Sequence, residues 1–393
     1  MIARHQLPAW SPLNLRALAA GIIPPPSSRA LGRIERRIAD EYRPRSLLLT
    51  RSGTIALALA MRASAPEGLR PRIGLPAWGC FDLMTAADAV DAEVVLYDLD
   101  PETLAPEQAS FRGMLAREPH AAVVAHWFGV PVDLGPWAEL ARSAGALLVD
   151  DAAQAVGASL RGAPLGIGGD FGILSFGRGK GRTGGEGGAL LAASPSAQAA
   201  LQGVARALAP PGRGFTSFAA VCAQWAFGRP PLYWVPVALP SLRLGETIYR
   251  PPPEFCAMSS RSAAVLEAVW DFSARETEVR RANAERWRQI LQVPAASATT
   301  IAPPEGGVAG WLRYPVLADD PLRSRLDSQA ARRHGVVRGY PRSLSELPVA
   351  VGRTISPGGE FEGARRLAHS LFSFPTHRMV RTNDFEAIAS LID

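Results

Sequence analysis

A chain of 393 residues is long enough for two domains that share a substantial core, and 47% hydrophobic with 20% charged residues is typical of a globular protein. Its three widely spaced cysteines form neither a disulfide framework nor a metal-ligand pattern, which favours a reducing cytoplasm and predicts no metal site. The net charge is +6, but the arginines are dispersed, so the charge favours small anionic ligands as well as it favours nucleic acid, and nothing else indicates a nucleic-acid partner.

Short apolar segments alternate with amphipathic ones through the first half of the chain. Helices are expected at residues 34–43, 54–63 and 136–145, and strands at 46–50, 72–78, 92–100, 121–129 and 145–151. This rhythm predicts an α/β fold with a mainly parallel central sheet flanked by helices. Ligands of such sheets bind at the carboxyl ends of the strands. Four polar residues are expected there, namely Thr54, His126, Asp150 and Asp151.

Proline-rich loops are expected at the start of the second half, over residues 195–258. The apolar stretch 214–242 is interrupted by an arginine and prolines, so no transmembrane helix is predicted. Residues 259–291 predict one long helix with Arg/Glu pairs at helical spacing. A smaller α+β unit is expected after it, with helices at 321–335, at 361–372 and at the C-terminus. We therefore expect a large domain over residues 1–258, and the long helix with a small domain over 259–393.

Lys180 is the only lysine, and the other 41 of the 42 basic residues are arginines. An arginine cannot offer a neutral amine to a carbonyl group, so a retained lysine indicates amine chemistry; a compositional accident is the alternative. The surrounding glycines do not form a phosphate-binding P-loop, since Leu174 stands where a glycine is needed and Gly181 follows the lysine. The remaining interpretation is a Schiff base with an aldehyde cofactor, typically pyridoxal phosphate (PLP).

A PLP site also needs an acid for the ring nitrogen and donors for the phosphate. Asp151, at the end of an expected strand, is the candidate acid, with Gln154 three residues on; its alternative role is to cap the next helix. The phosphate donors are expected at a helix start, where backbone amides and the helix dipole converge. These candidates are Ser52, Gly53 and Thr54, with the hydroxyl of Ser175 as an addition. Plain helix capping is the alternative for the first group.

With these residues in place, the sequence resembles the DegT-type (DegT/StrS) sugar aminotransferases, which are PLP enzymes of fold type I. The resemblance runs from about residue 30 to the C-terminus. The matching motifs are S-G-T-x-A-L at 52–57, a proline-led segment within 75–104, H-x-x-G-x-x-x-D at 126–133, D-A-A-Q-A at 151–155, S-F-x-x-x-K at 175–180, G-E-G-G at 185–188 and a closing motif that contains His377. Their order and spacing make the resemblance specific.

The resemblance implies a PLP-dependent aminotransferase. It would move an amino group from an amino acid, by analogy glutamate, to a keto sugar, nucleotide-linked, in surface polysaccharide or secondary-metabolite biosynthesis. Lys180 would form the Schiff base and move the proton, Asp151 would pair with the ring nitrogen, and Gln154 would lie near the ring and its oxygen. The phosphate would be held by Gly53, Thr54 and Ser175. Family members are homodimers with active sites between subunits, so the resemblance implies a homodimer here.

Several positions depart from the family's pattern. Cys80 stands where the family usually has the aromatic residue that stacks on the cofactor, which leaves Phe81 or Trp78 as candidates for that contact. Val156 stands where a histidine is frequent. Phe255 occupies the place of an asparagine that reaches the phosphate across the dimer. These changes put the usual substrate in doubt more than the cofactor.

Three further residues are candidates for substrate binding. Arg178 and Arg182 flank the lysine, and arginines that line the cleft would suit a diphosphate. Exposed loop arginines are their alternative reading. His377 belongs to the closing motif.

Three other functions compete with amino transfer to a nucleotide-linked sugar. A sugar 3-dehydratase has the same fold, but that branch carries histidine at the lysine position, which Lys180 contradicts. An aminotransferase for a keto-cyclitol or another non-nucleotide ketone fits the motifs equally well. A catalytically silent regulatory protein on the same fold is the third.

Overall fold

The computed structural model describes residues 4–23, 27–239, 247–292, 298–355 and 360–392. Its centre is an eight-stranded sheet with the order β1-β9-β8-β5-β4-β2-β3-β14. These strands are β1 (Ser46–Thr50), β2 (Arg72–Pro76), β3 (Glu93–Tyr97), β4 (Ala121–Ala125), β5 (Leu147–Asp151), β8 (Phe171–Ser175), β9 (Gly188–Ala192) and β14 (Thr354–Ile355). Neighbours pair in parallel except at β9, which is antiparallel to both β8 and β1. The sheet is therefore mainly parallel, as predicted.

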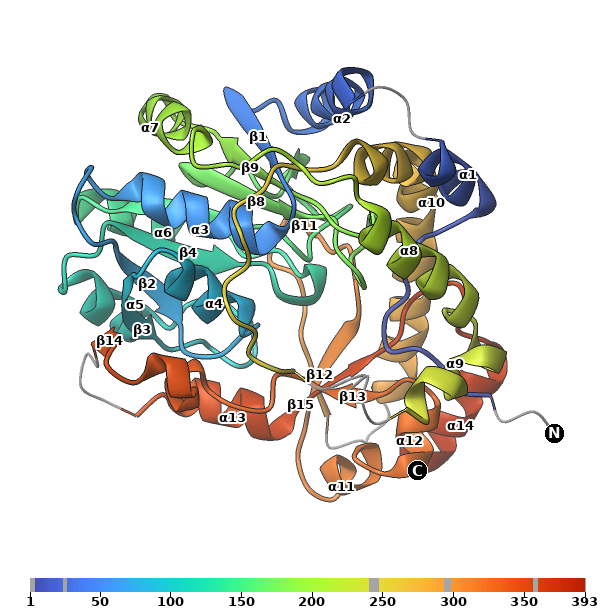
Figure 1. The fold of residues 1–393 in the computed structure, drawn as a ribbon. Helices are drawn as coiled ribbons and strands as arrows, with labels where there is room; N and C mark the ends of the chain where they lie inside the picture. Colours follow the sequence, from blue (N-terminus) through green and yellow to red (C-terminus); the bar gives the residue numbers. More distant parts are fainter. Residues whose placement is uncertain (1–3, 24–26, 240–246, 293–297, 356–359, 393) are drawn as a thin grey trace.

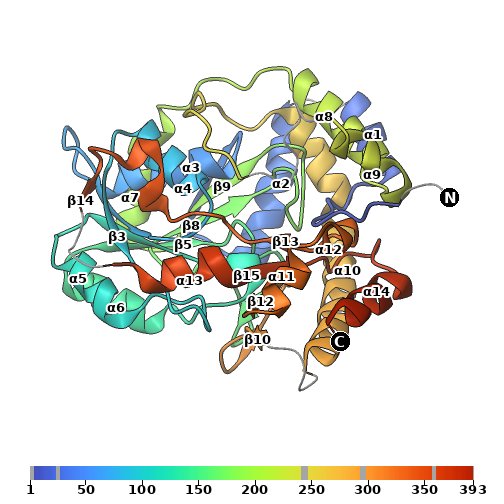
Figure 2. The same ribbon diagram turned by 90° about the horizontal axis from the view of Figure 1, so that it is seen from below.

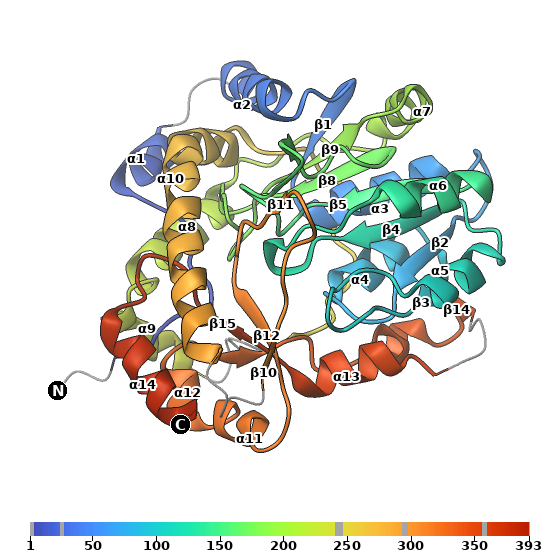
Figure 3. The ribbon, with the colours of Figure 1, turned by 180° about the vertical axis from the view of Figure 1, so that it is seen from behind.

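Helices cover both faces of this sheet. The chain order begins with α1 (Leu15–Ile22), α2 (Ser27–Tyr42), α3 (Gly53–Ser64), α4 (Asp82–Ala89), α5 (Gln108–Leu115) and α6 (Gly135–Ser143). Helices α3 and α4 lie on one face (Figure 1), and the opposite view shows α6 on the other (Figure 3). Because both faces are covered, β4, β8 and β9 are buried at every residue, which explains their continuous apolar sequences.

Residues 195–258 contain helices where loops were expected, so that prediction was wrong. The helices are α7 (Pro195–Ala205), α8 (Phe215–Phe227) and α9 (Pro230–Val237). A proline is the first residue of both α7 and α9. The first turn of a helix needs no intrahelical N–H donor, so proline is compatible with a helix start as well as with a loop.

The long helix α10 (Ser260–Leu291) begins after its N-cap Ser259 and connects the large sheet to a four-stranded one (Figure 1). The smaller sheet has the order β10-β12-β15-β13. Its strands are β10 (Ala298–Thr300), β12 (Tyr314–Ala318), β13 (Val337–Arg338) and β15 (Leu371–Phe374). The helices α11 (Leu322–Leu326), α12 (Gln329–Arg333), α13 (Glu362–Ser370) and α14 (Thr382–Ile392) complete this part, with α14 against α10 (Figure 2).

Two helices expected in the C-terminal part differ in the structure. The single helix expected at 321–335 is two short helices, because the side chain of Ser328 accepts the N–H of Ala331 and starts a new helix. The helix expected at 361–372 ends at Ser370, where the chain enters the buried strand β15 between β12 and β13. Pairing with strands distant in the sequence decides this ending.

The division at residue 258 stays a prediction, and three sets of contacts cross it. Strand β14, from the C-terminal part, pairs with β3 at the edge of the large sheet. The N-terminal segment contacts the C-terminal part through Arg4, which forms a 2.8 Å ion pair with Asp384. A three-stranded sheet, β11-β6-β7, joins the two parts as well. Its strands are β6 (Ser159–Leu160), β7 (Ala163–Pro164) and β11 (Gly307–Val308).

None of the helices in the described ranges is both long and apolar enough to span a membrane.

Candidate active site

A pocket with about 470 Å³ of open space, its mouth included, lies at the carboxyl ends of β4, β5 and β8 and at the first turn of α3. This is the place where a parallel sheet of this kind binds ligands. The pocket is lined by Gly53, Thr54, Leu57, Cys80, Asp82, Leu83, Ala125, His126, Trp127, Asp151, Ala153, Gln154, Ile173, Ser175 and Lys180. Six of the predicted cofactor residues are thus brought together: Gly53, Thr54, Asp151, Gln154, Ser175 and Lys180.

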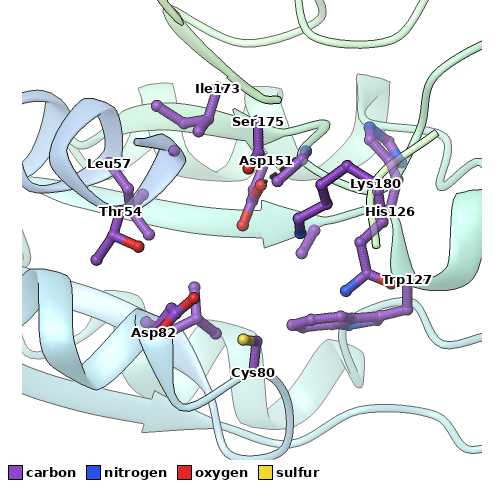
Figure 4. Close-up of a pocket in the computed structure, with 15 residues that line it drawn as sticks. Thr54, Leu57, Cys80, Asp82, His126, Trp127, Asp151, Ile173, Ser175 and Lys180 are labelled. Atoms are coloured by element: carbon purple, nitrogen blue, oxygen red, sulfur yellow. Dashed lines mark hydrogen bonds between the residues drawn. The ribbon is translucent and has the colours of Figure 1, made fainter. Parts of the chain in front are cut away.

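Lys180 lies in the loop between β8 and β9 and is the only lysine or arginine among the lining residues. Its amine reaches into the pocket towards Asp151 (Figure 4). The loop is held from outside, because the backbone N–H of Gly179 donates to Ser11 Oγ at 2.9 Å. The flexible lysine is therefore presented from an anchored turn.

Asp151 ends β5 and turns its carboxylate into the pocket (Figure 4). Its Oδ1 accepts the backbone N–H of Ala153 at 3.0 Å. Burial raises the pKa of the Asp151 carboxyl above its ordinary value, although this N–H and the charge of Lys180 act in the opposite direction. A desolvated carboxylate of this kind favours a cationic partner inside the pocket.

The preceding residue, Asp150, has a structural role instead. Its Oδ2 accepts the backbone N–H groups of Gly166 and Gly168 at 2.8 and 2.9 Å. Its Oδ1 lies 2.9 Å from Nε2 of His126, whose Nδ1 accepts the N–H of Val132 at 3.0 Å. This pattern assigns the proton of a neutral imidazole to Nε2, which donates to Asp150. Both histidine nitrogens are therefore engaged, and the ring is fixed as part of the pocket wall.

The first turn of α3 lies against the end of β8. A Cβ atom on Gly53 would be 2.7 Å from Ser175 Cβ and 2.9 Å from its Oγ, so only glycine allows this approach. Thr54 and Ser175 then place two hydroxyls beside the helix N-terminus, where backbone N–H groups and the helix dipole favour an anion. Ser52 is not a lining residue; its Oγ accepts the N–H of Ile55 at 3.2 Å, which is the helix-capping alternative.

Gln154 is oriented by two hydrogen bonds at the inner end of the pocket. Its Oε1 accepts the N–H of Phe128 at 3.0 Å, and its Nε2 donates to the hydroxyl of Tyr340 at 2.8 Å. Burial raises the pKa of Tyr340 well above its ordinary value, so the phenol stays neutral. Since Tyr340 belongs to the C-terminal part, this hydrogen bond connects the C-terminal part of the chain with the pocket.

Trp127 and Cys80 form the wall opposite Lys180 (Figure 4). The indole of Trp127 needs the space left by Gly79, where a Cβ atom would be 2.3 Å from Trp127 Cη2. Burial raises the pKa of the Cys80 thiol to about 12, so the sulfur is neutral. The sequence analysis did not identify Trp127, although its position directly after His126 at the end of β4 is a signal that was available.

The two aromatic candidates near Cys80 do not line the pocket. Phe81 is buried in the core at the start of α4. Trp78 is fully buried and donates Nε1–H to the carbonyl of Tyr340 at 2.9 Å. The structure therefore does not bring Phe81 or Trp78 to the lining of this pocket, and the contact of Phe81 with the cofactor stays a prediction.

The three substrate-binding candidates also lie outside the pocket lining. Arg182 is buried, stacks on Trp270 at 3.7 Å, and donates to Glu41 and Ser273, each at 3.0 Å. All sides of this guanidinium are thus engaged away from the site. Arg178 is exposed on the loop before Lys180. The expectation that arginines line this pocket is not met by its described residues.

His377 has a structural position as well. Its Nε2 donates to the carbonyl of Leu7 at 2.9 Å, and its Nδ1 accepts the N–H of Met379 at 3.3 Å. Burial lowers its pKa to about 4, so the ring is neutral near pH 7. The closing motif thereby fastens the N-terminal segment. No group of three or more metal-ligating side chains occurs within the described ranges.

Comparison with known proteins gives this site a family context. Residues 28–214 match the model of the DegT/DnrJ/EryC1/StrS aminotransferase family. A curated L-glutamine:2-deoxy-scyllo-inosose aminotransferase of Streptomyces kanamyceticus is 33% identical over 42% of this chain and 38% of its own length. A GDP-perosamine synthase of Caulobacter vibrioides is 32% identical over 41% of this chain and 43% of its own. The matched region thus spans well under half of these relatives.

Solved structures extend the likeness to nearly the whole chain. AtS13 from Actinomadura melliaura superposes with a TM-score of 0.74 at 20% identity, covering 99% of this chain and 98% of that one. Helicobacter pylori PseC, an aminotransferase of pseudoaminic acid biosynthesis, gives 0.75 at 13% identity over 99% and 98%. At such identities the likeness is one of fold, and it confirms the predicted fold-type I architecture.

Proposed function

Because residues 28–214 match the model of the DegT/DnrJ/EryC1/StrS aminotransferase family, we propose that the chain belongs to this family and is a PLP-dependent aminotransferase that moves an amino group from an amino acid to the ketone of a sugar or cyclitol. The observation that carries the proposal is the single lysine facing a desolvated aspartate across a pocket that ends at a helix N-terminus. A regulatory protein without catalysis would have no need for this combination.

The donor set fits PLP at each of its functional groups. Asp151 suits the protonated ring nitrogen, because a buried carboxylate gains most from a cationic partner. The cradle of Gly53, Thr54 and Ser175 suits the phosphate, because a dianion is favoured at a helix N-terminus. Trp127 offers a flat apolar face for the ring, on the side opposite Lys180.

When bound, PLP supplies an aldehyde that condenses with amines and a protonated ring that withdraws electrons. Lys180 Nζ would hold the cofactor and, once displaced by the substrate amine, carry the proton to and from the substrate carbon. Asp151 would keep the ring nitrogen protonated throughout. Gln154, fixed by Phe128 and Tyr340, would orient the ring oxygen. These roles are assigned from position in the pocket.

The acceptor is either a nucleotide-linked keto sugar or a keto-cyclitol. The name of the perosamine synthase supports the first, and those of the glutamine-dependent inosose aminotransferases support the second. Because none of the pocket's lining residues is an arginine, a diphosphate would have to be bound beyond them, and this observation favours the cyclitol. By the same names, glutamine stands beside glutamate as a candidate donor.

The decisive measurement is the visible absorbance of the protein supplied with PLP, before and after each amino acid. A yellow band that bleaches with glutamate or glutamine establishes the first half-reaction, and a Lys180→Ala protein should show neither the band nor the bleaching. After the donor has bleached the band, the protein is mixed with a nucleotide-linked keto sugar or with a free keto-cyclitol. The compound that restores the yellow band is the acceptor. A band that no amino acid changes would contradict aminotransferase activity, and the absence of any band would contradict PLP binding.

The assembly and location are further parts of the proposal. A homodimer is supported by the exposed apolar side chains of Phe215, Phe227 and Trp234 on α8 and α9, which a second subunit would cover. A cytoplasmic location is supported by the free cysteines, which are Cys80, Cys222 and Cys256. Light scattering during size-exclusion chromatography tests the first, and fractionation of the source cells tests the second.

A further inference from the structure

Arg313 is an arginine from the C-terminal part of the chain that the fold brings to Phe128, the residue that follows the pocket residue Trp127. It lies directly before β12, in a segment fastened to the loop that follows β4. The backbone N–H of Gly310 donates to Gly129 O at 2.9 Å, and that of Leu312 donates to Phe128 O at 2.8 Å. Since Trp127 in the same loop forms the pocket wall, these bonds set the position of Arg313 relative to the site.

The guanidinium of Arg313 has no acidic partner among the described residues. It lies 5.3 Å from the centre of the Phe128 ring, and its Nε is buried without a hydrogen-bond partner among them. Burial lowers its pKa, and the ionisable groups close enough to affect it are Tyr340 and Cys80, neither of which carries charge near pH 7. A half-buried cation in such surroundings is incompletely compensated.

Two other arginines that lie over aromatic rings in this protein are paired with acids. Arg338, near Phe372 in the same small sheet, pairs with Asp327 at 2.7 Å. Arg182, on Trp270, pairs with Glu41 at 3.0 Å. Arg313 has the ring contact without an acidic partner among the described residues, and an anion from outside the chain would complete its environment.

The two ionisable neighbours of Arg313 belong to the pocket or are bonded to it. Cys80 lines the pocket beside Trp127, and Tyr340 accepts a hydrogen bond from the lining residue Gln154. Because Tyr340 accepts there, its own hydroxyl proton is available to a second acceptor. Arg313 and Tyr340 together would present a planar fork and one hydroxyl to the same anion.

We propose that Arg313 binds the carboxylate of the amino donor, an inference that rests on the proposed function. The carboxylate of an α-amino acid is one bond from the carbon whose proton Lys180 would move, so its binding group must lie close to the pocket, and Arg313 lies over Phe128, directly after the pocket residue Trp127. A guanidinium matches a carboxylate through two parallel hydrogen bonds. A nucleotide diphosphate would call for more than this single cation.

The test measures carboxylate binding separately from turnover. The binding of glutarate, an unreactive dicarboxylate, is followed by calorimetry in the PLP-loaded and the cofactor-free protein. We expect Arg313→Gln to raise the glutarate Kd at least about tenfold, and Arg313→Lys to raise it less, because lysine keeps the charge but not the fork. With glutamate or glutamine, the concentration that gives half-maximal bleaching should rise by a similar factor, and the limiting rate should change much less.

The matched control is Arg286→Gln. Arg286 also lies over a phenylalanine ring, that of Phe385 at 4.0 Å, but on the far part of α10. This variant should leave the glutarate Kd unchanged. Thermal unfolding of each variant shows whether it is folded, and Arg313→Lys serves if the glutamine variant is not.

A glutarate Kd that is equal in the wild-type and Arg313→Gln proteins would overturn the carboxylate site. If the same variant binds pyrophosphate more weakly, the anion at Arg313 belongs to the acceptor's phosphates instead. If the wild-type protein binds no PLP, the proposed function fails, and glutarate binding to the cofactor-free protein still decides the role of Arg313.

Discussion

Asp150 and Asp151 are adjacent in β5 and serve opposite sides of it. Successive residues of a strand point in opposite directions, so one carboxylate accepts from His126 and two backbone N–H groups while the next faces the pocket. Two identical side chains therefore have separable roles, and their asparagine variants form a matched pair.

Asp150→Asn should lower the free energy of unfolding by about 1–3 kcal/mol, because an amide cannot accept all the hydrogen bonds that the buried carboxylate accepts. Urea denaturation measures this change. An unfolding free energy equal to that of the wild type would contradict the structural role.

Asp151→Asn should leave the unfolding free energy nearly unchanged, because its carboxylate accepts one hydrogen bond among the described residues and is disfavoured by burial. The rate at which the donor bleaches the cofactor band should fall about 100-fold or more, since a neutral amide no longer favours a protonated ring nitrogen. Stopped-flow absorbance checks the rate. A rate like that of Asp150→Asn would show that the effect is not specific to the pocket.

Gly53→Ala should reduce both stability and PLP affinity, because its Cβ would be 2.7 Å from that of Ser175. The expected loss of stability is about 1–3 kcal/mol, typical of overpacking. Adding Ser175→Gly should restore much of the stability, since it removes the opposing atoms, but not the affinity, since it also removes a hydroxyl. A double variant no more stable than Gly53→Ala would show that another contact is responsible.

Trp127→Leu should weaken PLP binding about 2- to 10-fold, the loss expected for one aromatic stacking contact. Titration of the cofactor, followed by absorbance and by quenching of tryptophan emission, gives the Kd. Trp137→Phe is the control, because Trp137 packs on Phe111 on the outer side of the sheet. Equal affinities of the Trp127 and Trp137 variants would mean that the indole is not the cofactor's wall.

His377 should make the protein less stable in acid. Its pKa is lowered on folding from about 6.5 to about 4, so the unfolded chain takes up a proton at higher pH than the folded one. Its contribution is fully present above pH 6.5 and is lost as the pH falls towards 4, by about 3 kcal/mol in total. His377→Gln, which retains a donor for Leu7, should remove this part of the slope. Denaturation at several pH values measures it, and an unchanged slope would contradict the assignment.

The pocket residues that could be predicted from the sequence occur in short motifs at the ends of parallel strands. Asp151 and Ser175 end their own strands, Lys180 follows on the next loop, and Gly53 begins a helix directly after β1. The convergence of strand ends at one edge of a parallel sheet follows from the fold class, so local pattern was sufficient for these residues.

Neighbouring residues whose side chains leave that edge could not be assigned in this way. Arg182 is two residues from Lys180, yet its guanidinium lies against α2 and α10, where it pairs with Glu41 and stacks on Trp270. His377 belongs to a family motif, but its hydrogen bonds tie down the N-terminal segment. Arg182 was identified by its closeness to Lys180 and His377 by its motif, and neither signal gives the direction of the side chain.

The sequence by itself determined the α/β class, the mainly parallel sheet, the likeness to the aminotransferase family and the lysine–aspartate pair, because each is encoded by local periodicity or by residues a few positions apart. Only the tertiary structure decided that Trp127 and Cys80 form the opposite wall and that Arg313, 133 residues beyond Lys180, lies over the ring of Phe128 next to that wall. Contacts between distant segments depend on how the buried surfaces of the whole chain pack together, and packing of this kind leaves no periodic signal in the sequence.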